Sequence, residues 1–118
     1  MKILMKRTYE EADKSDGFRI LADRLWPRGI KKENAHIDLW AKEISPSTDL
    51  RKSYHSYEID FKEFSKEYLK ELKENPQIKD FLKSLKEYKT VTFLTSAKEI
   101  EVSALPVLKN FIEDNNKK

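Results

Sequence analysis

The sequence contains no cysteine, only two glycines and only two histidines. The absence of cysteine excludes disulfides, cysteine nucleophiles and thiolate metal ligands, and it suits a reducing compartment. Two glycines are too few to form a phosphate-binding loop or a dinucleotide-binding fingerprint. Two histidines without cysteine also give little basis for a site of three or four metal ligands. We therefore expect neither a bound metal nor a cofactor.

Long apolar runs and an excess of one charge are missing as well. The first residues, MKILMKRTYEE, hold no run that could act as a secretory signal or a membrane anchor. We therefore expect a cytoplasmic protein without a membrane partner. The 24 basic and 21 acidic residues leave a net charge of only +3. This balance favours a small anionic ligand over nucleic acid as the partner.

The residues that are present fit one folded domain. The chain has 118 residues, and we place a single domain at 1–118 with a frayed end at 113–118. Six Phe, five Tyr and two Trp are enough to anchor a modest core. The apolar spacing predicts strands at 2–9, 18–25 and 90–95, and helices at 31–44, 45–55, 60–74, 78–85 and 105–113.

The order of these elements indicates the fold class. A strand that returns after several helices favours parallel pairing, so the prediction is an α/β fold with a small, largely parallel sheet of three or four strands flanked by helices. Ligands of such sheets gather beyond the carboxyl ends of the strands. The second strand leads into Asp23 and Arg24, and the third ends at Thr95 and Ser96. If these two strands are neighbours, both groups of side chains lie on one edge of the sheet.

The stretch ADRLWPRGIKK concentrates charged and aromatic residues after the second strand. Arg24 and Arg28 carry planar guanidiniums, which bind phosphate or carboxylate through paired hydrogen bonds. Lys98 would complete a cationic rim, and Trp26 would stack on a ring of the ligand. The alternative is structural, with the arginines paired internally and the tryptophan packed on the core. The predicted ligand-binding residues are Arg24, Trp26, Arg28 and Lys98.

Three residues are candidates for catalysis, and no spacing joins them into a known catalytic group. Asp23 could act as a general base or orient an arginine. Ser96 could be a nucleophile if a base lies close to it. His55 could transfer a proton, or it could make an ordinary local hydrogen bond.

The segments DRLWPRGI at 23–30 and DLWAKEISPSTDLRK at 38–52 resemble the YeaO-like family, a widespread bacterial domain of unknown function (domain of unknown function 488). The resemblance runs through nearly the whole chain and implies a compact α/β domain, but no established reaction. The family pattern after LRK includes a His-Asp pair, where this chain has Ser56 and Tyr57, and it has a polar residue where this chain has Val102. If those positions are catalytic in relatives, the chemistry here is lost or altered.

Three functions remain open on these grounds. The first is an enzyme or binding protein for a small phosphorylated or nucleotide-like ligand in a cationic pocket at the strand ends. The second is a module that binds nucleic acid or protein without catalysis. The third is that DRLWPRG is architectural and that the protein acts elsewhere on its surface. The sequence leaves the substrate and the oligomeric state open.

Overall fold

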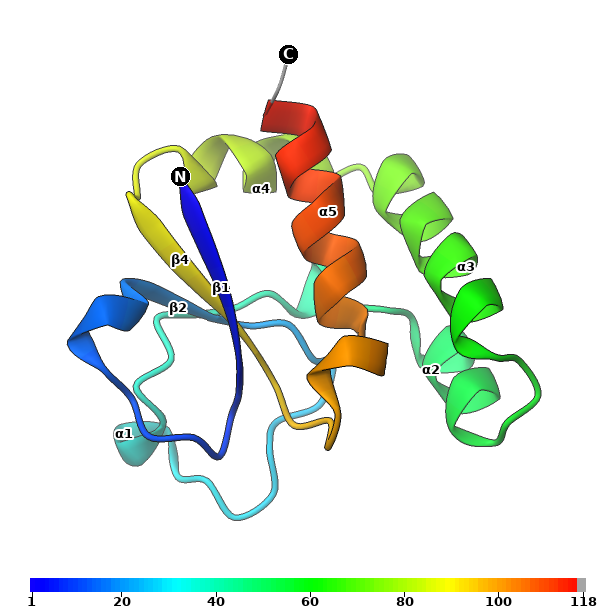
Figure 1. The fold of residues 1–118 in the computed structure, drawn as a ribbon, viewed down its shortest axis with the longest axis horizontal. Coiled ribbons are helices and arrows are strands. Elements are labelled where there is room, and N and C mark those ends of the chain that lie inside the picture. Colours follow the sequence, from blue (N-terminus) through cyan, green and yellow to red (C-terminus); the bar gives the residue numbers. More distant parts are fainter. Residues whose placement is uncertain (117–118) are drawn as a thin grey trace.

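In a computed structural model, which describes residues 1–116, the fold is built on a four-stranded sheet (Figure 1). The strands are β1 (Lys2–Arg7), β2 (Phe18–Leu21), β3 (Leu39–Trp40) and β4 (Thr90–Thr95). They lie in the order β1-β4-β2-β3, and every neighbouring pair is parallel. The predicted α/β class is confirmed, and β4 occupies the buried central position that its apolar sequence indicates.

Five helices and three short 3-10 turns connect or cover the strands. The helices are α1 (Lys32–Ala35), α2 (Thr48–His55), α3 (Phe61–Glu74), α4 (Ile78–Leu85) and α5 (Ala104–Asn116), and the 3-10 turns are η1 (Lys14–Asp16), η2 (Lys42–Ile44) and η3 (Ile100–Val102). Ser47 and Asp60 cap α2 and α3, because each side chain accepts a hydrogen bond from a backbone N–H of the first turn. Of the residues expected to fray, 113–116 continue α5, and 117 and 118 lie outside the described residues.

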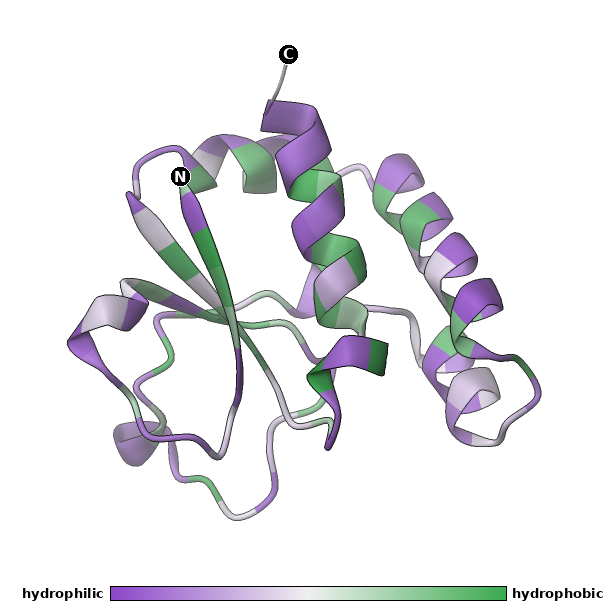
Figure 2. Ribbon diagram, in the orientation of Figure 1, coloured by the Kyte–Doolittle hydropathy of each residue, from purple (hydrophilic) through white to green (hydrophobic). Residues whose placement is uncertain are grey.

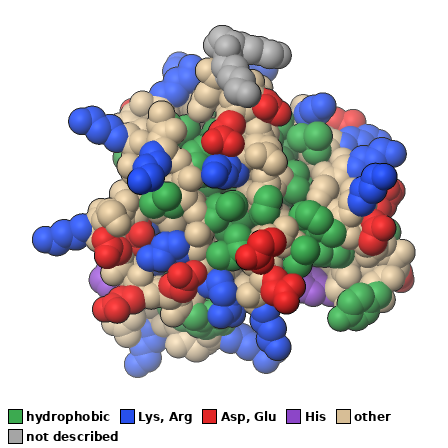
Figure 3. All heavy atoms as spheres, in the orientation of Figure 1, with side chains coloured by type: hydrophobic (Ala, Val, Ile, Leu, Met, Phe, Trp, Pro, Cys, Tyr) green, Lys and Arg blue, Asp and Glu red, His purple; other side chains and the backbone are tan. Residues whose placement is uncertain are grey.

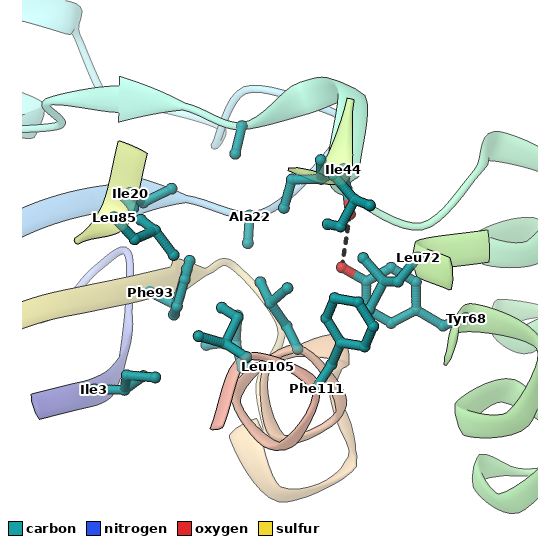
Figure 4. Packing of buried hydrophobic residues seen from close by; sticks show 14 of the residues in the cluster. Ile3, Ile20, Ala22, Ile44, Tyr68, Leu72, Leu85, Phe93, Leu105 and Phe111 are labelled. Atoms are coloured by element: carbon teal, nitrogen blue, oxygen red, sulfur yellow. Dashed lines mark hydrogen bonds between the residues drawn. The ribbon is translucent and has the colours of Figure 1, made fainter. Parts of the chain in front are cut away.

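One face of the sheet carries the hydrophobic core. Figure 2 shows apolar and polar residues alternating around α3 and α5, as expected of helices that bury one side. Figure 4 shows Ile3, Ile20 and Phe93 of three strands gathered with Leu85 of α4 and Leu105 of α5. These helices therefore form a layer on this face of the sheet.

The opposite face of the sheet has a polar centre. Side chains alternate along a strand, so Lys6, Arg19 and Thr92 point away from the helices. Asp16 of η1 meets all three: its carboxylate pairs with Lys6 and Arg19, and its carbonyl accepts a 2.6 Å hydrogen bond from the Thr92 hydroxyl. The segment between β1 and β2 thus closes this face without a helical layer. One carboxylate thus serves two cations, in a site where Asp16 is only 2% exposed.

Several predicted bounds shift by a few residues, and two predicted elements differ more from the structure. The helix predicted at 31–44 is wrong, because this segment contains α1, then β3, then η2. Its apolar residues have helical spacing, but Leu39 and Trp40 pair with β2 as a short edge strand, and the flanking amides of Asp38 and Ala41 donate to carbonyls of β2. The strand predicted at 18–25 ends at Leu21 because Asp23 turns toward the end of β4.

Candidate functional site

Asp23 joins the carboxyl ends of β2 and β4. One of its oxygens accepts a 2.9 Å hydrogen bond from the Thr95 hydroxyl, and the other accepts bonds of 2.7 and 3.0 Å from the Ser96 amide and hydroxyl. The two strands are neighbours, so the expected meeting of both strand ends on one edge is confirmed. Both carboxylate oxygens accept hydrogen bonds, so Asp23 links the end of β2 to the end of β4. Catalysis by Asp23 or Ser96 stays a prediction that this geometry does not favour.

Arg24 binds the segment that precedes α2. Its Nε donates to the carbonyl of Pro46 and its Nη2 to the carbonyl of Ser45, both at 3.0 Å. Arg24 also lines a hollow of about 370 Å³, whose wall includes Tyr68 and Glu71. These two contacts fit the structural alternative described above, and ligand binding by Arg24 stays a prediction.

Trp26 packs against Trp40 of β3. The two rings meet edge to face, with centroids 5.4 Å apart. Each indole N–H donates to a backbone carbonyl: Trp26 to Ile30 at 2.6 Å and Trp40 to Asp23 at 2.7 Å. The packing of Trp26 on Trp40 thus fixes the loop that carries the DRLWPRG motif to the edge strand β3.

Arg28 and Lys98 are exposed. Within residues 1–116, neither side chain makes a hydrogen bond or an ion pair, so both cations remain available. The Arg28 carbonyl accepts a 3.2 Å hydrogen bond from the Tyr9 hydroxyl, which ties the motif to the loop after β1. Gly29 follows with a φ of 76°, a conformation that glycine adopts without strain. Ligand binding by Arg28 and Lys98 stays a prediction.

His55 lies at the C-terminal end of α2, far from the motif along the chain. It is exposed and lines a shallow surface depression together with Asp49 and Glu58. Its role in proton transfer stays a prediction.

A different hollow lies beside the end of β1, around α1 at the lower left of Figure 1. We call it the loop hollow. It has a volume of about 420 Å³ and lies between the loop 8–12 and the segment 29–36, with Arg19 also in its wall. No sequence signal identified it, because its residues come from two connections of ordinary polar composition.

Thr8 is the unusual residue of the loop hollow. It is only 6% exposed, and its hydroxyl oxygen is buried without a hydrogen-bond partner among the described residues. A buried hydroxyl usually has a partner, since leaving it unpaired costs about 1–3 kcal/mol. His36, in the same wall, adopts a left-handed conformation with a φ of 51°, which is uncommon for a residue other than glycine. Features of this kind cluster at functional sites.

The charges of the loop hollow are mixed. Arg19 is buried and bound to the Asp16 carboxylate and the His36 carbonyl. Burial by itself raises the pKa of Asp16, but hydrogen bonds from the Asp13 amide, Lys6 and Arg19 hold it below its usual range. This pair therefore stays ionised and neutral overall, so Arg19 offers the hollow hydrogen bonds more than net charge.

The position of the loop hollow follows from the topology. After β1 the chain crosses the polar face of the sheet, where η1 contacts β4. After β4 it forms α5, which packs on the opposite, helical face. The two neighbouring strands thus send their connections to opposite faces, and α/β proteins bind ligands in the crevice at such a switch point. Thr8, whose amide donates to the Thr95 carbonyl, lies directly at this place.

Two other kinds of site were tested on the described part of the chain. No helix within residues 1–116 combines the length and apolarity needed to cross a bilayer. The His, Asp and Glu side chains of these residues form no group of three or more that could hold a metal ion.

Comparison with known proteins identifies the family. The chain is 44% identical to the uncharacterized protein YeaO of Escherichia coli over 112 residues, which are 95% of this chain and 97% of YeaO. It is 35% identical to the uncharacterized proteins Mb3100c of Mycobacterium bovis and Rv3073c of Mycobacterium tuberculosis over 107 residues, which are 91% of this chain and 90% of each relative. No solved structure matches the chain. A family model described as the inactive DUF488-N3 subclade matches residues 2–118. The matching model is that of the inactive DUF488-N3 subclade, and the chain belongs to the YeaO-like DUF488 family, as the DRLWPRGI and DLWAKEISPSTDLRK segments predict.

Proposed function

We propose that this protein binds a small, nucleotide-like anionic ligand in the loop hollow and does not catalyse a reaction. The observation that carries the proposal is Thr8, which lines the hollow and whose buried hydroxyl has no hydrogen-bond partner within residues 1–116. A ligand oxygen or nitrogen in the hollow would satisfy this hydroxyl.

The size and place of the hollow support a small ligand. Its volume of about 420 Å³ falls within the range of about 300–1,000 Å³ that is common for small-molecule sites. It lies at the carboxyl end of β1, next to the switch point between β1 and β4. On the face seen in Figure 3, basic and acidic side chains are interspersed, which favours a local ligand over a polyanion spread across that face.

The residues of the wall suit the parts of a nucleotide. The ring of Tyr9, which is 48% exposed, offers a stacking surface for a base. Glu11 and Asn34 can accept hydrogen bonds from sugar hydroxyls, and Lys31 supplies a cation for a phosphate. Arg28, next to the wall residue Gly29, adds the second cation, in keeping with its predicted role.

Two observations favour binding without catalysis. Both oxygens of the Asp23 carboxylate accept hydrogen bonds from Thr95 or Ser96, which disfavours this strand-end acid as a general base. The family description carries the word inactive, and Ser56 and Tyr57 stand where the family pattern has a His-Asp pair. Both agree with a domain that keeps a binding site and has lost its chemistry.

A ligand screen by thermal shift tests the proposal. The panel contains nucleosides, nucleotides, sugar phosphates and inorganic phosphate, each added in large excess. A ligand present at about 100 times its dissociation constant stabilises the folded protein by about 2.7 kcal/mol, which a melting curve resolves readily. We expect nucleotides to raise the melting temperature and inorganic phosphate to raise it less.

Two threonine variants locate the site. Thr8→Val removes the hydroxyl from the hollow and should abolish most of the ligand-dependent shift. Thr92→Val removes a buried hydroxyl from the same face of the sheet, outside the wall of the hollow, and should leave the ligand-dependent shift intact. Equal shifts in the two variants would contradict the assignment. Conversion of a bound nucleotide, detected by mass spectrometry, would contradict the absence of catalysis.

A further inference from the structure

Four side chains form a row on the surface beside β3: Lys32, Trp26, Trp40 and Lys42. The Lys32 ammonium lies 6.0 Å from the ring centroid of Trp26, the two rings are 5.4 Å apart, and the Lys42 ammonium lies 5.2 Å from the ring of Trp40. We call this set the tryptophan row. We propose that the tryptophan row binds single-stranded nucleic acid by stacking bases on the indole rings and holding phosphates with the lysines.

The fold presents these rings in a way that leaves stacking as their main means of recognition. Both indole N–H groups already donate to backbone carbonyls, those of Ile30 and Asp23. Neither ring can therefore read the hydrogen-bonding edge of a base. Both tryptophans are only partly buried, so part of each ring stays accessible. A rigid aromatic surface without free donors suits recognition that tolerates any base sequence.

The lysines of the row complete the chemistry of a nucleic-acid platform. Both are exposed and lie over the rings, where an exposed cation–π contact is weak compared with the stacking of a base. A base would therefore displace the ammonium from the ring face. The displaced lysine, on its flexible stem, would remain close enough to meet the phosphate of the same nucleotide.

The surrounding charges favour an anionic partner. Arg28 and Lys31 lie on the same β2–β3 connection and are exposed. Of the three acids of this connection, Asp23 and Asp38 accept hydrogen bonds from neighbouring groups, whereas Glu33 is exposed and accepts none within residues 1–116. In a duplex the bases are stacked on one another and cannot stack on the indole rings, so a duplex would contact only the lysines. We therefore expect the row to prefer a single strand.

None of the four residues of the row belongs to the wall of the loop hollow, and only the neighbouring cations Arg28 and Lys31 are shared between the two proposals. A failure of nucleotide binding in the hollow would therefore leave this proposal intact, and the reverse also holds.

Intrinsic fluorescence tests the row directly, since Trp26 and Trp40 are the two tryptophans of the chain. The protein is titrated with single-stranded oligo-thymidylate and oligo-uridylate of about ten nucleotides, a length within the usual site size of one small domain. The expected result is saturable quenching by one or both oligomers, and the comparison distinguishes DNA from RNA. A DNA duplex of the same length should quench the tryptophan fluorescence far less. Absence of quenching by both single strands would overturn the proposal.

Charge variants and a second polyanion separate stacking from simple attraction. We expect the double variant Lys32→Ala, Lys42→Ala to bind about tenfold more weakly or worse, and its salt slope to fall by about 1.4, since each phosphate contact to a single strand contributes about 0.7. The matched control, Lys62→Ala with Lys66→Ala on exposed positions of α3, should bind as the wild type does. Equal weakening in the two double variants would overturn the proposal, as would equal quenching by polyglutamate of similar charge.

Discussion

Replacement of Thr8 by valine should make the free protein more stable. The two side chains have nearly the same shape, so the exchange removes a hydroxyl and adds a methyl group without opening a cavity. The Thr8 hydroxyl is buried without a partner, whereas in the unfolded chain it is hydrated. Folding therefore desolvates this group without compensation, and valine avoids that cost.

The size of the effect follows from the burial. Leaving a buried hydroxyl unpaired costs about 1–3 kcal/mol, and we take the lower part of this range. A gain of about 1–2 kcal/mol in the free energy of unfolding corresponds to a rise of about 3–10 °C in the melting temperature for a domain of this size. Urea denaturation should show the same gain as a higher midpoint with an unchanged slope.

Thr92→Val is the matched control for this measurement. The Thr92 hydroxyl is also buried, but it donates a 2.6 Å hydrogen bond to the Asp16 carbonyl. Valine at this position leaves the carbonyl without its donor and should lower stability by about 1–3 kcal/mol. The two exchanges are chemically identical and should have opposite signs. If Thr8→Val destabilises the protein as Thr92→Val does, the Thr8 hydroxyl has a partner in the free protein and is not held in reserve for a ligand.

Three further changes test the fold. Asp16→Asn should cost about 3–5 kcal/mol by urea denaturation, because it leaves the buried Arg19 without its counter-charge; retention of most of the stability would contradict the buried pair. Because the folded-state pKa of Asp16 is lowered, its contribution is present above the unfolded value near 3.8 and is lost as the pH falls through the folded-state value, so the variant should show a flatter acid limb. Tyr57→Gly should raise stability by about 0.5–1 kcal/mol, since Tyr57 is 92% exposed and has a φ of 63°; a loss in thermal melting would point to an unrecognised contact. Tyr68→Phe should cost about 1–2 kcal/mol, because the buried hydroxyl donates to a backbone carbonyl at 2.8 Å, and a neutral effect would place that carbonyl in contact with water.

The sequence predicts the fold best where local pattern and tertiary packing agree. The helix at 61–74 and the strand at 90–95 follow from their apolar spacing, because each buries the face that its own pattern marks. The segment 31–44 does not follow from its pattern. Its outcome is decided by the backbone pairing of Leu39 and Trp40 with β2, a long-range contact that spacing alone does not reveal.

The candidate site was predicted in part for the same reason. The strand-end rule correctly brings Asp23 beside Ser96 on one edge of the sheet. It does not reveal that Asp23 and Ser96 hydrogen-bond to each other rather than to a ligand. It also does not reveal that Arg24 donates to the Pro46 carbonyl. The loop hollow depends on how two connections pack against each other, which the sequence does not show. Thr8 stands out only because its buried hydroxyl has no hydrogen-bond partner among the described residues.

The departures from the family pattern also gain a structural meaning. Ser56 and Tyr57 form the end of α2, where the amides of Tyr57 and Glu58 donate back to the carbonyls of Tyr54 and Ser53. This is the Schellman arrangement, in which a left-handed residue closes a helix. In this chain the position therefore serves to end a helix, with an aromatic ring extending into solvent.

The central place of β4 determines when the protein can fold. β1 pairs with β4 alone, and β2 has only the two-residue β3 as its other neighbour, so most of the sheet waits for residues 90–95. During synthesis the early strands leave the ribosome with unpaired edges, and they can neither form the sheet nor bury the apolar face that α5 later covers. The nascent chain must therefore remain unassembled until its last strand arrives. The risk of aggregation through unpaired strand edges is therefore greatest before β4 is available.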